Sequence, residues 1–222
     1  THEAAYRIVY DIYSSAILRD TIQRYRIRDV ELLERVVKYV FDNIGNCFSA
    51  KNVADYFKSQ QRKIDLNTVY NYLHALECAF IIYRVPRYDI KGKEILKTQE
   101  KYFAGDPSLI FSVMGFKERM LSGILENIVM LEIQRRGHNV FVGKEGAREI
   151  DFVAEKNGNK IYIQVTCQMS TPETLAREIA PLKNVNDNYP KYIVSLDATW
   201  GDNIEGIKHV NIAEFLLLET WN

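Results

Sequence analysis

The feature that most constrains the fold is the segment REIDFVAEKNGNKIYIQVTCQ, residues 148–168. It reads as two apolar strands on either side of a Gly-Asn turn. Each strand nevertheless carries a polar residue within its apolar run, Asp151 in the first and Gln164 in the second. Because buried polar groups need hydrogen-bond partners or a metal ion, these two side chains predict a polar site inside a sheet domain.

Strand periodicity predicts where these side chains point. Side chains alternate between the two faces of a strand, which puts Asp151 and Val153 on one face, opposite Ile150 and Phe152. If the polar faces of the two strands match, Asp151 and Gln164 lie side by side. The sequence therefore predicts one surface that presents both.

A third polar residue interrupts an apolar stripe. Glu126 lies among the apolar residues of a helix that is predicted to end at Gly137. An acid in such a stripe needs a partner. Carboxylate and amide oxygens suit Mg²⁺ or Mn²⁺, so a divalent ion held by Glu126, Asp151 and Gln164 would explain all three.

The other segments divide the chain into two predicted domains, residues 1–100 and 101–222. Asp106 followed by Pro107 is typical of a helix start, so we place the junction between residues 100 and 106. The second domain reads as helix, three strands, helix and strand, which predicts an α/β sandwich around a mixed sheet. The first reads as three helices and a hairpin that turns at residues 91–93, an order typical of a winged helix. The predicted fold class is therefore α/β (α+β).

A winged helix can place its third helix in the DNA major groove and its hairpin on the backbone. The predicted DNA-binding residues are therefore the polar residues of the third helix and the cations of the hairpin: Asn67, Asn71, His74, Arg84, Arg87, Lys91 and Lys93. The third helix has no Arg or Lys between Asn67 and Phe80. A winged helix that serves only as a linker or docks a protein is an equal alternative.

Longer segments carry a resemblance to a known family. They are RYDIKGKEIL, KYFAGDPSL, LENIVMLEIQRRGHNVFVGKEGAREIDFVA, YIQVT, LAREIAPL and DNYPKYIVSLD. They resemble the C-terminal (DUF4143) region of a prokaryotic family of AAA+-type ATPases, and the pattern of Glu126, Asp151 and Gln164-x-Thr166 resembles the PD-(D/E)XK nuclease superfamily. The resemblance implies a restriction-endonuclease-like αβββαβ domain over residues 101–222. It also implies that ATP binds only in an N-terminal ATPase domain of the same polypeptide.

The nuclease superfamily also implies roles for the polar residues. Its helix acid, strand Asp and next-strand Glu or Gln hold the metal, so Glu126, Asp151 and Gln164 would be the catalytic residues, with Mg or Mn as cofactor. The bound metal would lower the pKa of a water molecule that attacks the phosphodiester.

Position 166 departs from that superfamily, because Thr166 stands where a Lys assists catalysis. A threonine hydroxyl carries no charge and is a poor base. The expected function is a nuclease-like module that binds DNA and no longer cleaves it. Three alternatives stay open: an active Mg- or Mn-dependent DNA endonuclease, a protein-interaction domain, and a polar site that is purely structural. Glu178 either faces this site or pairs with Arg177 or Lys183 at the surface.

Composition limits the partners. The chain has 29 basic and 29 acidic residues, which argues against a general polyanion binder, although residues 1–100 carry a net +3 and residues 101–222 a net −3. No apolar run of membrane-spanning length occurs, so no membrane is expected. Three cysteines without ligand spacing predict buried, reduced thiols in a cytoplasmic protein. DNA, the ATPase domain and further copies of the chain are the expected partners.

Overall fold

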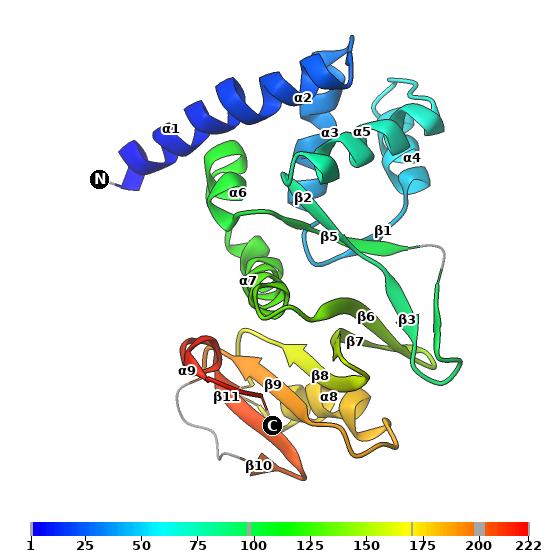
Figure 1. The fold of residues 1–222 in the computed structure, drawn as a ribbon, viewed down its shortest axis with the longest axis vertical. Helices are drawn as coiled ribbons and strands as arrows, with labels where there is room; N and C mark the ends of the chain where they lie inside the picture. The colour runs from blue at the N-terminus through cyan, green and yellow to red at the C-terminus, as the bar shows by residue number, and fades with distance from the viewer. Residues whose placement is uncertain (1, 97–98, 170, 198–202, 222) are drawn as a thin grey trace. The chain divides into compact units, whose positions relative to one another are not determined.

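The computed structural model describes residues 2–96, 99–169, 171–197 and 203–221, and its fold is drawn in Figure 1. It is a mixed α/β protein with many helices and a large mixed sheet, which confirms the predicted fold class at this level. The chain forms two compact units. The first unit comprises residues 1–84 and 99–120, and the second comprises residues 85–98 and 121–222.

The first unit is mainly helical. Its helices are α1 (His2–Ile12), the π-helical η1 (Tyr13–Leu18), α2 (Arg19–Arg24), α3 (Val30–Asp42), α4 (Ala50–Ser59), α5 (Leu66–Cys78), α6 (Pro107–Met114) and the 3₁₀ turn η2 (Glu118–Met120). Its strands are β1 (Cys47–Phe48), β2 (Ile82–Val85) and β5 (Glu100–Ala104), in the sheet order β1-β5-β2.

Side-chain caps begin α3, α4 and α5, and Asp106 caps α6 in the same way. Asp29 accepts a backbone N–H from the first turn of α3 at 2.9 Å. Ser49 and Asn52 form a reciprocal capping box at the start of α4, and Asp65 accepts the N–H of Asn67 at 2.9 Å at the start of α5. Each cap satisfies an N–H group that helix geometry leaves unpaired. Local sequence therefore explains where these helices begin.

The second unit is built on an eight-stranded mixed sheet in the order β10-β11-β9-β8-β7-β6-β3-β4. Its strands are β3 (Arg87–Asp89), β4 (Glu94–Ile95), β6 (Asn139–Glu145), β7 (Arg148–Lys156), β8 (Asn159–Val165), β9 (Lys191–Ser195), β10 (Asn203–Ile204) and β11 (Ile207–Asn211). Its helices are α7 (Leu121–Arg135), α8 (Pro172–Lys183) and α9 (Ile212–Leu217).

The predicted hairpin belongs to this second sheet. Strand β4 pairs antiparallel with β3, and β3 pairs parallel with β6. The turn is held by Asp89, whose carboxylate accepts the N–H groups of Lys91 and Gly92 at 3.1 Å each. The hairpin therefore forms the β3–β4 edge of the sheet of the second unit.

Helices cover both faces of this sheet (Figure 1). Helix α8 packs on one face, where the apolar core includes Val153, Tyr162, Ile179, Leu182 and Ile193. Helix α9 packs on the other face, where the rings of Tyr192 and Phe215 meet at 6.2 Å. Helix α7 contacts α9, so α7 and α8 lie on opposite faces.

A β-bulge interrupts strand β7. Phe141 of β6 pairs with Val153, but Gly143 pairs with Ile150, so Asp151 and Phe152 together face a single residue of β6. A bulge breaks the alternation of side chains. Ile150 and Val153 accordingly lie in the same core, and the expectation that they point to opposite faces is wrong.

Two further predictions concern the burial of the cysteines and the absence of a membrane-spanning helix. Cys47, Cys78 and Cys167 are free thiols. Cys78 is exposed and the other two are half-buried, so the expectation of buried thiols is wrong. Within residues 2–96, 99–169, 171–197 and 203–221, no helix has both the length and the apolar character required to cross a membrane.

Candidate functional site

The predicted acid and amide meet at the bulge. Asp151 Oδ2 accepts the Val165 N–H at 2.9 Å, and the Asp151 N–H donates to Gln164 Oε1 at 3.3 Å. The pairing of β7 with β8 reaches only Phe152 and Ile163 at this end of the strands. The two side chains therefore replace backbone ladder bonds where the strands separate, which explains why an acid and an amide stand in apolar strands.

Helix α8 extends this pair into a network. Gln164 Nε2 donates to Glu178 Oε2 at 3.1 Å, and Arg177 donates to Glu178 Oε1 at 2.8 Å. Glu178 is 8% exposed, so the ion pair with Arg177 balances a charge that is largely removed from water. Glu178 fits both interpretations, because it faces the site and also pairs with Arg177. Lys183 pairs with Glu205 instead.

A pocket of about 360 Å³ opens beside this network. Its lining is Arg148, Glu149, Gln164, Arg177, Glu178, Ala180 and Pro181. Two arginines are matched by two glutamates, so the lining carries no excess of positive charge for an anionic substrate. Arg148 also donates to the Ala180 carbonyl at 3.2 Å.

Glu126 reaches the end of β8 from α7, on the face opposite α8. It is buried. Burial and then the negative charge of Glu126 raise the pKa of the Cys167 thiol, which places Glu126 close to Cys167. The structure thus brings Asp151 and Gln164 together, adds Glu178, and puts Glu126 beside Cys167.

Two donor atoms of the predicted ion site, Asp151 Oδ2 and Gln164 Oε1, accept backbone N–H groups. Glu126 belongs to α7. In the part of the chain that the structure describes, no three His, Cys, Asp or Glu side chains gather as a metal-ion site. The predicted Mg or Mn site, with two carboxylates and one amide, stays a prediction.

Two neighbours of the network are packing residues. The Tyr162 hydroxyl donates to Asp187 Oδ2 at 2.6 Å, and its ring lies in the α8 core. Burial, followed by the hydrogen bond to Asp187, raises the pKa of Tyr162, so the phenol stays protonated. Thr166, at the position of the nuclease Lys, is buried, and its hydroxyl donates to the Gln168 carbonyl at 3.5 Å.

The predicted DNA-binding residues of α5 share an exposed face. Asn67, Asn71 and His74 are all exposed there. The His74 ring lies 3.6 Å from the Cys78 sulfur and meets the Tyr25 ring edge-on at 6.2 Å. This face offers amides and aromatic rings.

The predicted cations of the hairpin do not form one patch. Arg84 pairs with two acids of the first unit at 3.7 Å each. Lys91 pairs at 2.9 Å with the buried carboxylate of Glu145 in the second unit. Arg87 is half-buried in β3, and Lys93 lines an apolar pocket. Strand pairing therefore disperses charges that the sequence places within ten residues.

The sequence interpretation missed two cations that follow Tyr25, whose ring meets His74 of α5. Arg26 and Arg28 belong to the loop before α3, next to Tyr25, and both are exposed. Neither forms an ion pair with any residue that the structure describes. The alternating run YRIRD contains the signal for them, since it places two arginines in a short loop between helices.

Comparison with known proteins gives one family and several relatives. The model of the family described as "Domain of unknown function (DUF8612)" matches residues 1–120. A Haemophilus influenzae relative, "Uncharacterized protein", is 34% identical over 210 residues, which are 95% of this chain and 52% of the relative. The Methanocaldococcus jannaschii relative "Uncharacterized protein MJ1544" is 29% identical over 167 residues, 73% of this chain and 37% of the relative. The chain thus spans about half or less of the length of these curated relatives.

A solved structure, "Crystal structure of protein VC1899 from Vibrio cholerae", is similar at 13% identity with a TM-score of 0.30. The match covers 91% of this chain and 54% of that chain. This likeness carries no argument about the present protein.

These findings correct the family inferred from sequence segments. The matching family is DUF8612 and not DUF4143, and neither curated relative is described as an ATPase. The expected membership of the DUF4143 family of AAA+-type ATPases is therefore wrong. The expectation that ATP binds in a preceding domain stays a prediction. The segments behind the DUF4143 resemblance include the β6–β8 strands, the cap of α6 and the body of α8, which record local folding patterns that unrelated α/β families share.

Proposed function

This chain belongs to the family described as "Domain of unknown function (DUF8612)", and from its own residues we propose that it is a DNA-binding, nuclease-like module that does not cleave DNA. In this proposal the first unit is a winged helix made of α3, α4, α5 and the β1-β5-β2 sheet. The second unit is a restriction-endonuclease-like αβββαβ fold made of α7, β6, β7, β8, α8 and β9.

The observation that carries the loss of cleavage is that the polar network is satisfied internally. Asp151 accepts from Val165, Gln164 accepts from Asp151 and donates to Glu178, and Arg177 balances Glu178. A metal nuclease instead needs carboxylate oxygens directed at the ion and a group that stabilises the attacking water. Thr166, at the position of that group, carries no charge.

DNA binding is supported by the first unit. Arg26 and Arg28 are exposed in the loop that follows Tyr25, whose ring meets His74 of α5, and they suit phosphate oxygens. Asn67 and Asn71 present side-chain amides, which can pair with the edge of adenine in the major groove. Phosphate contacts would supply affinity, and the amides of α5 would supply base preference.

The test of binding is duplex DNA titrated at several salt concentrations, with fluorescence anisotropy as the readout. The double variant R26Q/R28Q should weaken binding for all sequences and lower the salt slope by about 2, since each phosphate contact contributes roughly 0.9. N71A should change base preference and leave the salt slope unchanged. The matched control is R7Q/K38Q, which removes two exposed cations from α1 and α3. No binding by the wild type at low salt would refute the proposal and favour a protein-docking role.

The test of cleavage is nicking of supercoiled plasmid with Mn²⁺, using wild type and D151N. We expect intact plasmid in both. Nicking by the wild type that is lost in D151N would refute the non-catalytic assignment and restore the endonuclease alternative.

A further inference from the structure

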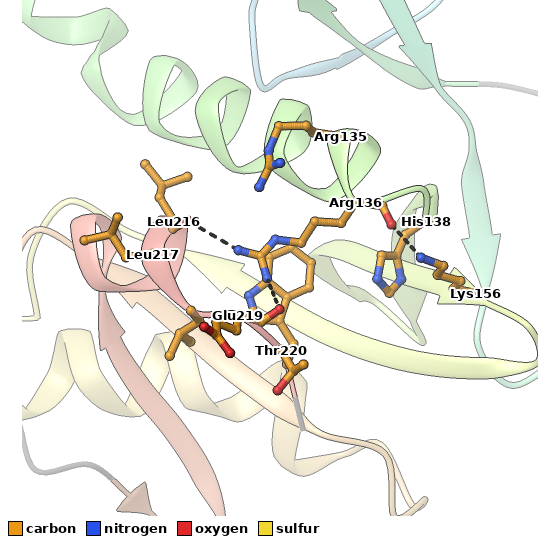
Figure 2. A pocket seen from close by; sticks show the side chains of 10 residues that line it. Arg135, Arg136, His138, Lys156, Leu216, Leu217, Glu219 and Thr220 are labelled. Carbon is orange, nitrogen blue, oxygen red and sulfur yellow. Dashed lines mark hydrogen bonds between the residues drawn. The ribbon is translucent and has the colours of Figure 1, made fainter.

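A second pocket, with a volume of about 620 Å³, lies at the C-terminal end of β7, beside Lys156 (Figure 2). Asp151 lies nearer the other end of this strand. The end of α7, the start of β6, the end of β7 and the tail after α9 form its walls. The lining is Arg135, Arg136, His138, Lys156, Leu216, Leu217, Leu218, Glu219, Thr220 and Trp221. It shares no residue with the polar network.

Positive charge exceeds negative charge in this pocket. Arg135 and Arg136 both donate to the same buried acid, Glu132, at 2.7–2.8 Å. Lys156 donates to the Arg136 carbonyl at 2.7 Å, as Figure 2 shows. Three cations thus stand against one buried carboxylate, which binds two of them, while Glu219 lies at the exposed rim.

The two arginines retain donors for a ligand. A guanidinium has five N–H groups. Arg135 uses its Nε and Nη2 on Glu132, and its side chain is 67% exposed. Arg136 is spread over Glu132 and the carbonyls of Leu216 and Glu219, and it lies 4.2 Å from the centre of the Trp221 ring. Arg136 therefore holds the tail in place, and Arg135 remains available to an incoming group.

Two buried nitrogens in the same walls have no hydrogen-bond partner among the described residues. They are His138 Nδ1 and Trp221 Nε1. An indole nitrogen can only donate. Burial, then the charges of Lys156 and Arg136, lower the pKa of His138, so the ring is neutral at pH 7 and carries one N–H. Native proteins rarely leave such groups without a hydrogen-bond partner, so the two nitrogens point to a ligand at this place.

We propose that this pocket binds a phosphate-type oxyanion, either free phosphate or the terminal phosphate of a nucleotide. The pocket supplies many donors and few acceptors, and a phosphate is an acceptor on every side. The donors also come from four separate segments, whereas a carboxylate accepts mainly in one plane. The indole N–H is buried, so contact with it requires movement of the tail that Arg136 holds. This inference is independent of the DNA-binding proposal.

The direct test uses Trp221 as the reporter. The chain has two tryptophans, so W200F leaves Trp221 as the single tryptophan, excited selectively over the 14 tyrosines; Trp200 lies outside the described residues. Inorganic phosphate is titrated at constant ionic strength against chloride and acetate. We expect a saturable response to phosphate and none to acetate. A nucleoside 5′-monophosphate and oligonucleotides with a 5′-phosphate or a 5′-hydroxyl then distinguish free phosphate from a strand end.

Calorimetry on variants locates the binding. R135Q should weaken phosphate binding about tenfold, because a charge-assisted pair with the ligand is lost. Urea unfolding of R135Q measures separately the stability lost with the Arg135–Glu132 pair. W221F keeps the ring and removes the N–H, and should weaken binding about fivefold. K58Q, an exposed lysine of α4, is the matched control and should bind like the wild type. Phosphate should also raise the pKa of His138, followed by NMR.

Three results would overturn the assignment. The first is no saturable response to phosphate or nucleotide. The second is unchanged affinity in both R135Q and W221F. The third is an equal response to acetate, which would make the pocket a general carboxylate site.

Discussion

Replacement of Asp151 separates a structural carboxylate from a metal ligand. Asp151→Ala removes the acceptor of the Val165 N–H, which stays buried. A hydrogen bond to a charged group contributes about 1.5–3 kcal/mol, and an unsatisfied buried donor costs about 1–3 kcal/mol. Since both figures describe the same lost bond, we expect the second unit to lose roughly 2–3 kcal/mol of unfolding free energy. Asp151→Asn retains a carbonyl oxygen at this place and should lose less than about 1 kcal/mol.

Hydrogen exchange at the Val165 amide is the assay, because it reports this one bond within a two-unit chain. Exchange in Asp151→Ala should accelerate about 30- to 150-fold, from about 1.4 kcal/mol per factor of ten. Asn159→Ala, at the exposed start of β8, is the control and should leave Val165 unchanged. Equal losses in the Ala and Asn variants, or a gain of stability in either, would refute the reasoning. Such a result would show that stability depends on the negative charge of Asp151 and not on its hydrogen bond, as for a metal ligand.

Three other changes test the packing and charge of the second unit. Gly143→Ala should cost roughly 1–3 kcal/mol in urea unfolding, because the new Cβ would lie 2.9 Å from the Val153 Cγ2. Hydrogen bonds from Arg135 and Arg136 lower the pKa of Glu132 from its usual value of 4.5. Ionised Glu132 therefore stabilises the fold above that pH, and this stabilisation is lost as the pH falls through the lowered pKa of the folded state. Glu132→Gln should therefore flatten the fall of the melting temperature below about pH 4.5, and an unchanged acid profile would contradict this. Tyr162→Phe removes a 2.6 Å donor to a carboxylate and should cost about 1–2 kcal/mol in the same urea assay, whereas no loss would show that the bond is not formed in solution.

Local patterns predicted much of the fold. Hydrophobic spacing located α3, α5, α7 and the strands β6, β7 and β8, and the Asp106-Pro107 pair marked the start of α6. The same patterns missed α1, α2 and β5. Much of α1 is exposed apolar surface, including Ile8 and Ile12. Strand β5 was taken as the junction between domains because its partners, β1 and β2, are far away in the sequence.

The candidate site was predicted in part. The sequence identified Asp151 and Gln164 as an unusual pair, and the hydrogen bond between them agrees with their being neighbours. It left open whether Glu178 belongs with them, since a helix residue meets a strand residue only when the helix packs. Local patterns also could not predict which acids the hairpin cations pair with. Arg84 and Lys91 are seven positions apart, yet they pair with acids of different units.

The sequence by itself determined where helices and strands form and which polar residues stand in apolar surroundings. These are properties of spacing, and spacing is local. Only the tertiary structure decided that Asp151 sits in a bulge, that Glu126 reaches the sheet from the face opposite Glu178, and that buried donors gather at the end of α7. Each of these depends on strand register and on which helix covers which face, and both are set by contacts between residues distant in the chain.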